Sequence, residues 1–398
     1  MPLLAPKIMT QHTKTQPQIA EWKRLDGVDL LRGLAIFFVL MNHVNIRLLI
    51  AKVPYLQVLP AQVAHSLVWN GQFGVQIFFV VSGFLITSTT LRRWPSSTRV
   101  KVVEFYKLRF ARIAPLLLTL LLILSILHFA RVGNYVVGSK TGGLGRALLA
   151  TMTFRVNVLE AQRGYLPGSW DVLWSLSVEE MFYLFFPIAM WFLGRGKWFV
   201  ALLSVFVVLG PFGRTVWAHG NYMWEEYSYL GRTDAIALGC LTALLVSRVR
   251  FSRRAIQAFC VGGLGTLIFI LGFSLWAFRL GLDRNGLDMT ILAIGTCLVI
   301  IAAAQSQWKS PWVMSPVVRL GQRSYEVYLT HMFVVFTFFG LFLRVGKPMW
   351  LVPVLFVVVI LVAAVLGAAV AKFYSEPLNR RLRARFGYES KGTLPVRP

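Results

Sequence analysis

Apolar runs of about 20 residues, the length that crosses the hydrocarbon core of a membrane, recur from one end of the chain to the other. Unpaired backbone groups in hydrocarbon cost several kcal/mol each, so such runs must be helical. The two-residue alternation of a membrane β-barrel is absent. Ten spans are predicted, at residues 29–51, 71–91, 113–132, 172–193, 198–213, 230–247, 255–277, 289–307, 324–343 and 350–374. The pattern predicts an all-α, polytopic membrane bundle of about ten transmembrane helices.

Composition excludes an ordinary soluble protein. Of the 398 residues, 57% are hydrophobic and 14% are charged, whereas soluble domains carry about 25% charged residues. The net charge of +25, from 41 basic and 16 acidic residues, would suggest a nucleic-acid partner in a soluble protein. Here the basic residues lie mostly in short loops between apolar runs, so we expect no nucleic-acid partner.

The distribution of loop charges predicts the orientation. With the N-terminus in the cytoplasm, the inside segments hold 26 of the 41 basic residues, and the outside loops and outer span ends hold 13. The positive-inside rule therefore places both termini in the cytoplasm. The chain divides into a cytoplasmic N-terminal segment (1–25), a transmembrane domain (26–377) and a basic cytoplasmic tail (378–398).

The first span, in LDGVDLLRGLAIFFVLMNHV, contains Arg32 and His43. An ionisable group at the centre of a span costs roughly 2.5 to 3.5 kcal/mol on insertion scales, so it needs a reason. The two residues are eleven positions apart, which puts them on one helix face and about 16 Å apart along the axis. Arg32 is expected near the cytoplasmic boundary and His43 beyond the middle of the membrane.

This spacing suits a long donor with an anionic head at the cytoplasmic edge and a reactive end deeper in the membrane. Coenzyme A has such a shape, and a histidine can take a proton from an attacking hydroxyl at neutral pH. The alternative is structural: Arg32 extends to the lipid headgroups, and His43 hydrogen-bonds a neighbouring helix.

Further polar residues occur near span ends. Lys107, Arg109 and Arg112 in FYKLRFARIAP are either topology anchors or ligand-binding residues. Glu179 and Glu180 lie about eight residues into the fourth span, so at least one carboxylate should face the bundle interior, where such groups tend to be functional.

Other candidate residues have a structural interpretation beside the functional one. Arg232 and Asp234 open the sixth span as a local ion pair or as acceptor-binding residues. Ser82 stands beside Gly83, where a small pair most often permits close helix packing. Tyr328 and His331, three residues apart, are expected on one helix face. No histidine has a metal-like partner spacing, and we assign no metal site.

Seven stretches, in this order, resemble those of acyltransferase family 3, the bacterial polytopic membrane acyltransferases that modify cell-surface glycans. They are LDGVDLLRGLAIFFVLMNHV, FFVVSGFLIT, FYKLRFARIAP, LWSLSVEEMFYLFFP, GRTDAIALGCLTALL, LGQRSYEVYLTHMF and YSEPLNRR. One position departs from the common family pattern DGLRG: Leu30 replaces a glycine, so the backbone just before Arg32 is expected to differ.

The resemblance implies that Arg32 and His43 are an essential pair, that Arg109 and Arg112 are donor-side arginines, and that Ser82, Glu179, Tyr328 and His331 are further motif positions. From this and from the residue chemistry above we expect the following roles. His43 would be the general base, with Glu179 and Glu180 as further catalytic residues. The donor-binding residues would be Arg32, Arg109, Arg112, Ser82, Tyr328 and His331. Arg232 and Asp234 would bind the acceptor.

The resemblance also implies an activity and a location. The chain would move an acyl group, most simply acetyl, from cytoplasmic acetyl-CoA or another acyl-CoA to a hydroxyl of a glycan or glycolipid, in the bacterial cytoplasmic membrane. No permanently bound cofactor is expected. Two alternatives stay open: a transporter or flippase of a glycan or lipid-linked sugar, and an acyltransferase that uses another donor, such as succinyl-CoA, or a small acceptor such as a macrolide sugar.

Overall fold

The computed structural model describes residues 24–95 and 99–388. The predicted N-terminal segment, 1–25, therefore lies outside the described residues except for its last two positions. The predicted tail, 378–398, lies outside them from residue 389 onward. Within the described ranges the protein is helical and has no strand, which confirms the predicted fold class. Among the residues that the structure describes, ten helical spans are long and apolar enough to cross a membrane. Their main helices are α1 (Asp26–Ile50), α3 (Gly71–Arg93), α4 (Val102–Phe129), α8 (Leu173–Leu193), α9 (Lys197–Arg214), α11 (Tyr229–Arg248), α12 (Arg253–Leu267), α14 (Leu287–Ser306), α16 (Ser324–Arg344) and α17 (Leu351–Val370).

Shorter helices connect or extend these spans. They are α2 (Ala61–Ala64), α5 (Gly143–Met152), α6 (Val156–Arg163), α7 (Gly168–Asp171), α10 (Tyr222–Tyr227), α13 (Ser274–Arg279), α15 (Ser315–Gln322) and α18 (Glu376–Arg385). A π-helical segment, Ala371–Ser375, joins α17 to α18, so the last helix continues well beyond the predicted end of the tenth span.

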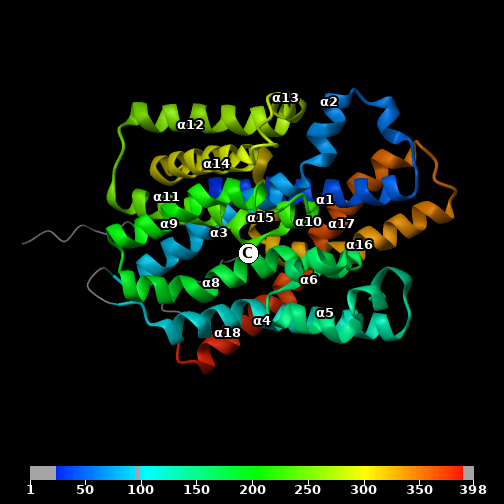
Figure 1. The fold of residues 1–398 in the computed structure, drawn as a ribbon, viewed down its shortest axis with the longest axis horizontal. Coiled ribbons are helices and arrows are strands. Elements are labelled where there is room, and N and C mark those ends of the chain that lie inside the picture. The colour runs from blue at the N-terminus through cyan, green and yellow to red at the C-terminus, as the bar shows by residue number, and fades with distance from the viewer. Residues whose placement is uncertain (1–23, 96–98, 389–398) are drawn as a thin grey trace, which may run out of the picture.

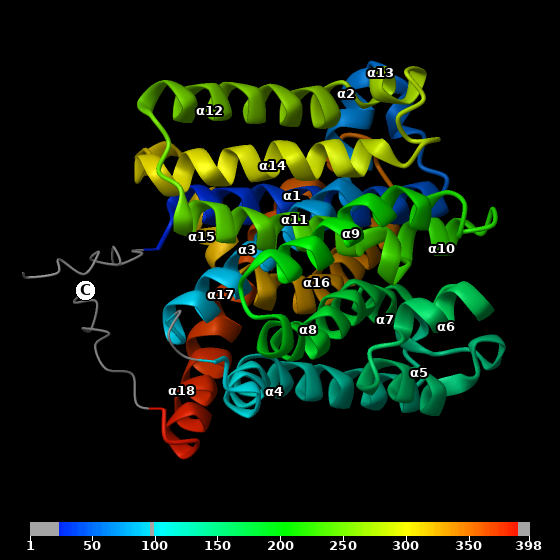
Figure 2. The same ribbon diagram turned by 60° about the vertical axis from the view of Figure 1, so that its left-hand side comes forward.

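The helices form a layered bundle in which α12 and α14 lie at one margin and α4 with α18 at the other (Figures 1 and 2). The spans that contain α11 and α14 are the most buried, whereas those of α9 and α12 are among the least. Since lipid tails are as apolar as the side chains they meet, the apolar outer faces of α9 and α12 suit contact with lipid.

Close backbone contact holds α3 against α11. A Cβ atom added at Gly83 would lie 2.0 Å from the carbonyl oxygen of Ile236, and one at Gly239 would lie 2.0 Å from that of Val80. Any larger residue would force these helices apart. The packing interpretation of Gly83 is therefore correct, and this contact fixes the position of its neighbour Ser82.

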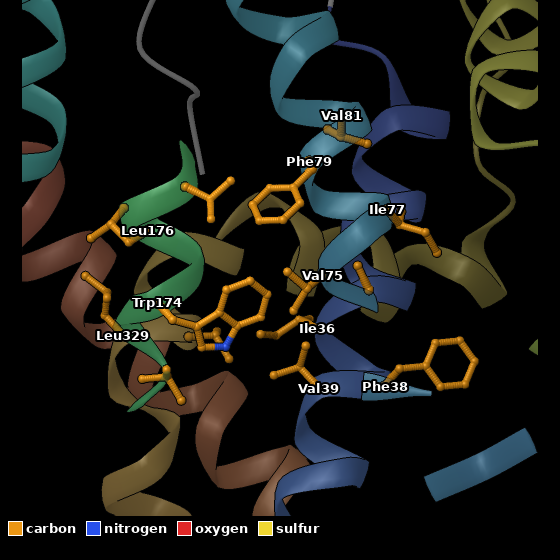
Figure 3. Close-up of a cluster of buried hydrophobic side chains, with 14 of the residues drawn as sticks. Ile36, Phe38, Val39, Val75, Ile77, Phe79, Val81, Trp174, Leu176 and Leu329 are labelled. Atoms are coloured by element: carbon orange, nitrogen blue, oxygen red, sulfur yellow. The ribbon is translucent and has the colours of Figure 1, made fainter. Parts of the chain in front are cut away.

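An apolar core lies beside these contacts, between α1, α3 and α8 (Figure 3). Trp174 of α8 extends toward Ile36 of α1 and Val75 of α3, and it packs edge to face on Phe79 with ring centroids 6.2 Å apart. Trp174, Ile36 and Phe79 are all buried. Their packing gives rigid support to the polar side chains of the same helices.

The structure differs from the sequence prediction at the third span. The apolar run predicts a start at residue 113, but α4 begins at Val102. The segment before Pro115 contains good helix formers, and Arg109 there is ion-paired to Glu180 of α8. Lys107, Arg109 and Arg112 therefore belong to the helix itself. At Leu30, where a changed backbone was expected, α1 is a regular helix.

The two ends of the described chain lie at the same end of the bundle. Arg24, just before α1, donates a hydrogen bond to the carbonyl oxygen of Gln322, 3.4 Å away. At that end, Arg93 of α3 pairs with Glu104 of α4 at 3.3 Å and stacks on Tyr388, which follows α18. Residues 24 and 388, the ends of the described chain, thus lie at one end of the bundle; that both termini are cytoplasmic stays a prediction.

Candidate functional site: an arginine-lined cavity and a histidine pair

A cavity of about 370 Å³ runs along one face of α3. The α3 residues that line it recur every three or four positions between Val75 and Arg93. This part of the helix is about 27 Å long at 1.5 Å per residue. The lining consists of Arg32, Val75, Phe78, Phe79, Val81, Ser82, Leu85, Ile86, Thr89, Thr90, Arg93, Trp94, Phe105, Leu108, Arg109, Arg112, Ile113, Ser175, Leu176, Glu179, Tyr183, Ser324, Tyr325, Tyr328, Leu329 and Arg383. The volume falls within the roughly 300–1,000 Å³ of small-molecule sites, and the shape suits an elongated ligand.

The lining is strongly basic. Five arginines face the cavity, from α1, α3, α4 and α18, against a single carboxylate, Glu179, among the lining residues that the structure describes. Arg32, Arg109 and Arg112, the three arginines predicted to bind the donor, are brought together here. A site of this charge favours an anionic ligand.

Ser82, Glu179 and Tyr183 form a hydrogen-bonded cluster midway along the cavity. Ser82 Oγ donates to Glu179 Oε1 and lies 2.5 Å from the hydroxyl of Tyr183, which itself donates to Glu179 Oε1 at 2.8 Å. Tyr183 was not among the predicted site residues, although it lies four residues after Glu179 and therefore on the same helix face. The serine is thus more than a packing residue.

Arg109 connects this cluster to Glu180. Its guanidinium donates to Glu180 Oε1 from Nη2 at 2.7 Å and from Nε at 3.1 Å, and it reaches Glu179 at 3.4 Å. The same group stacks on the ring of Tyr183, 3.7 Å from the centroid. Glu180 is buried and does not line the cavity. Both glutamates therefore contact Arg109.

The remaining two predicted arginines have their own carboxylate partners. Arg32 lies 3.8 Å from Asp29 and donates to Ser324 Oγ at 3.1 Å. Arg112 pairs with the buried Glu326 at 3.3 Å. These contacts hold each guanidinium in position at the cavity wall, with donors left over for a ligand.

Tyr328 closes the deep end of the cavity. Its hydroxyl lies 2.6 Å from Ser175 Oγ and donates to the carbonyl oxygen of Val172 at 2.9 Å. Its ring is 5.6 Å from that of His331. His331 and His43 are not lining residues, so Tyr328 lies between the cavity and the histidines.

His43 and His331 form a pair in a T-shaped contact, with ring centroids 4.9 Å apart. His43 Nδ1 lies 2.8 Å from the carbonyl oxygen of Val39, and His331 Nδ1 lies 2.6 Å from that of Tyr328. Because a carbonyl oxygen only accepts, each Nδ1 must carry the proton, which leaves each neutral ring with a free lone pair on Nε2. His331 Nε2 is buried without a hydrogen-bond partner.

Arg232 and Asp234, the predicted acceptor-binding residues, lie elsewhere in the bundle. Both are fully buried and are not in the cavity lining. They are paired with other residues rather than with each other, since residues two apart point to different sides of a helix. Arg232 contacts Glu226 at 2.7 Å, and Asp234 contacts Arg214 at 2.9 Å.

Sequence reasoning missed a buried carboxyl outside the cavity, that of Glu160. Glu160 of α6 is fully buried and accepts a hydrogen bond from the backbone N–H of Leu166 at 3.0 Å. Burial, and next the nearby Asp171 carboxyl, raise the pKa of Glu160 well above its ordinary value. Nothing in the polar loop around Glu160 distinguishes it from a solvated residue in the sequence.

Known proteins are similar to this chain in sequence. The chain is 24% identical over 391 residues to the O-acetyltransferase OatA of Staphylococcus aureus, in strain COL and equally in strain MRSA252. That match covers 93% of this chain but only 59% of the relative's length. No solved structure matches. The family model described as an acyltransferase domain matches residues 25–371, and the chain therefore belongs to acyltransferase family 3.

Proposed function

We propose that this protein is a membrane-embedded O-acyltransferase that moves an acyl group, most simply acetyl, from cytoplasmic acyl-CoA to a hydroxyl of a cell-surface or exported glycan. The family match and the relatives' printed name support the reaction class. One observation carries the proposal to this chain's own residues: an arginine-lined cavity leads along α3 to Tyr328, and the His43–His331 pair lies directly behind that tyrosine.

The cavity supports a donor with phosphate groups and a long arm. Arginines bind phosphates bidentately, and they are concentrated from the middle of the cavity to the end marked by Arg93. The deep end, around Phe78 and Leu329, is mostly apolar. An acyl-CoA with its phosphates at the basic end would place its thioester near Tyr328.

His43 is the general base of the proposed reaction. Its Nε2 lone pair takes the proton of the acceptor hydroxyl as that oxygen attacks the thioester carbonyl carbon. The carbon–sulfur bond then breaks, and the departing thiolate takes the proton back from His43. The hydroxyl of Tyr328, which donates to the carbonyl oxygen of Val172 in this structure, donates to the oxyanion once the side chain has shifted. Tyr328 must shift for acceptor and donor to meet.

Glu179 and Glu180 serve the donor side in this mechanism. Their contacts are to Arg109, Ser82 and Tyr183, and no hydrogen bond joins either of them to His43 among the described residues. They hold the Arg109 guanidinium in place. We therefore assign them positioning roles toward the donor.

The proposal is tested by acetyl-CoA turnover and product mass spectrometry in bacterial membranes that contain wild type or His43→Ala. The matched control is His219→Ala, which removes an exposed histidine that lies outside the cavity lining. Equal expression of all three proteins is checked by immunoblot. We expect acetylated glycan with wild type and His219→Ala, and a loss of about 10²-fold or more in rate with His43→Ala.

Each other outcome counts against a defined part of the proposal. Unchanged turnover by His43→Ala would remove His43 as the base. No consumption of acetyl-CoA or succinyl-CoA by wild type, together with export of an unmodified glycan, would replace the enzyme with the transporter alternative.

A further inference from the structure

The mouth of the cavity is partly built by α18, a helix that lies beyond the region matched by the family model, which ends at residue 371. Arg383 of α18 is one of the lining residues. The basic pattern NRRLRAR suggests only a tail that faces solvent or lipid headgroups. In the structure, α18 packs beside α4 (Figure 2).

Aromatic residues just after α18 fix this position. Phe386 lies under the ammonium of Lys107, which is 5.8 Å from the ring centroid. Tyr388 lies under the guanidinium of Arg93 at 5.6 Å. Both basic residues belong to helices that line the cavity, so Arg383 is held at the mouth from two sides.

Arg383 differs from the other four arginines of the lining in its partners. Arg32, Arg93, Arg109 and Arg112 each have a carboxylate within ion-pair distance. Arg383 has none among the described residues, and its Nε is buried without a hydrogen-bond partner. Arg93 and Arg112, whose charges are of the same sign, act on it electrostatically and line the same cavity.

An arginine beside two others, with a desolvated donor left unused, is unfavourable unless an anion completes the site. Simple anchoring to lipid headgroups does not explain it, because Arg381 and Arg385 of the same helix are exposed whereas Arg383 turns into the cavity. We propose that Arg383, together with Arg93, forms a phosphate-binding subsite at the cavity mouth. This inference rests on the proposed function, in which the phosphates belong to the acyl-CoA.

The test is direct binding of radiolabelled acetyl-CoA to the purified full-length protein in nanodiscs of neutral lipid. Wild type is compared with Arg383→Gln, and with Arg385→Gln as the matched control from the exposed side of α18. Circular dichroism and thermal unfolding establish that the variants are folded. A second probe, acetyl-CoA without its 3′-phosphate, distinguishes the 3′-phosphate from the diphosphate as the bound group.

We expect Arg383→Gln to weaken acetyl-CoA binding about tenfold or more, as the loss of a charge-assisted hydrogen bond predicts, with a smaller salt dependence. Arg385→Gln should bind as wild type. If the 3′-dephospho donor binds equally to wild type and Arg383→Gln, the subsite holds the 3′-phosphate; if the variant still weakens its binding, the subsite holds the diphosphate.

Two results would overturn the inference, and they are distinguishable. Wild-type affinity and salt dependence in a folded Arg383→Gln variant would remove the subsite while the acyl-CoA donor stands. Absence of acetyl-CoA binding to wild type would remove the proposed donor, and the phosphate subsite with it.

Discussion

The imidazole of His331 on α16 meets that of His43 on α1 edge to face, at a centroid distance of 4.9 Å. His331 is fully buried, whereas His43 is partly exposed. The more accessible ring is the one suited to meet an acceptor, and the buried ring fixes its orientation. His331 is therefore a positioning residue in the proposed reaction.

Replacement of His331 by Gln should lower kcat by about 10-fold to 10²-fold, because the base loses its packing partner. The KM for acyl-CoA should stay within about twofold, since His331 does not line the cavity. Steady-state kinetics in nanodiscs separate the two constants. A raised KM with unchanged kcat would instead assign His331 to donor binding.

Replacement of Arg109 by Gln should destabilise the fold. It leaves the buried Glu180 without the guanidinium that lies 2.7 Å away. Loss of one partner of a buried ion pair costs about 3–5 kcal/mol. Chemical or thermal unfolding in detergent measures the change.

The double variant Arg109→Gln with Glu180→Gln should recover part of that stability, because no uncompensated charge remains. The exposed pair of Arg380 and Glu376, 3.7 Å apart on α18, supplies the control. Arg380→Gln should change stability by less than about 1 kcal/mol. Equal effects of Arg109→Gln and Arg380→Gln would contradict the structural role of Arg109.

Ser82 offers a test of direct transfer against an acyl-enzyme. Its Oγ is hydrogen-bonded to Glu179 and faces the cavity, so a nucleophile and a carboxylate are adjacent. We expect direct transfer, and therefore no acetyl adduct on the protein after incubation with acetyl-CoA in the absence of acceptor. Intact-mass and peptide mass spectrometry detect such an adduct.

The variant Ser82→Ala should then retain turnover within about tenfold of wild type, since only the contacts of Ser82 Oγ with Glu179 and Tyr183 are lost. An acetyl group on Ser82 in wild type, together with abolished turnover in Ser82→Ala, would establish the covalent route.

Glu160 predicts a pH dependence of stability. Its pKa is raised in the folded protein, first by burial and then by the Asp171 carboxyl, so the folded state holds this proton more tightly than the unfolded state. The stabilisation is fully present below the unfolded pKa of about 4.3 and is lost as the pH rises through the folded pKa.

Glu160→Gln keeps the neutral form and an oxygen for the N–H of Leu166, which lies 3.0 Å from Glu160 Oε1. Its unfolding temperature should therefore fall less than that of wild type between about pH 5 and about pH 9. Thermal unfolding in detergent at several pH values makes the comparison. Parallel curves for the two proteins would show that Glu160 carries no such proton.

The sequence predicts the ten spans well because length and hydropathy alone decide whether a helix crosses the membrane. Arg32 stands out in the sequence as a charge within an apolar run, and the family resemblance points to Arg109 and Arg112; the structure places all three at one cavity. The start of α4 at Val102 was missed because hydropathy does not register a polar helical extension.

The sequence could not predict which residues form ion pairs with each other. Arg232 and Asp234 are neighbours in the chain, yet their ion pairs are with Glu226 and Arg214. Such pairing depends on which helices meet, and that is a tertiary property. Arg383 was not predicted for the same reason. Several arginines follow one another in this stretch, and only the packing of α18 places Arg383 in the cavity lining.

The closure of the cavity at Tyr328 has a consequence for the permeability of the membrane to protons. A polar cavity that extends about 27 Å along a spanning helix could, if it continued to the far side, conduct protons and discharge the membrane potential. The hydroxyl of Tyr328, bonded to Ser175 Oγ at 2.6 Å and to the carbonyl oxygen of Val172 at 2.9 Å, ends that path without leaving its own polar atom unpaired. We therefore expect Tyr328 to limit proton leakage through the cavity while the protein is at rest.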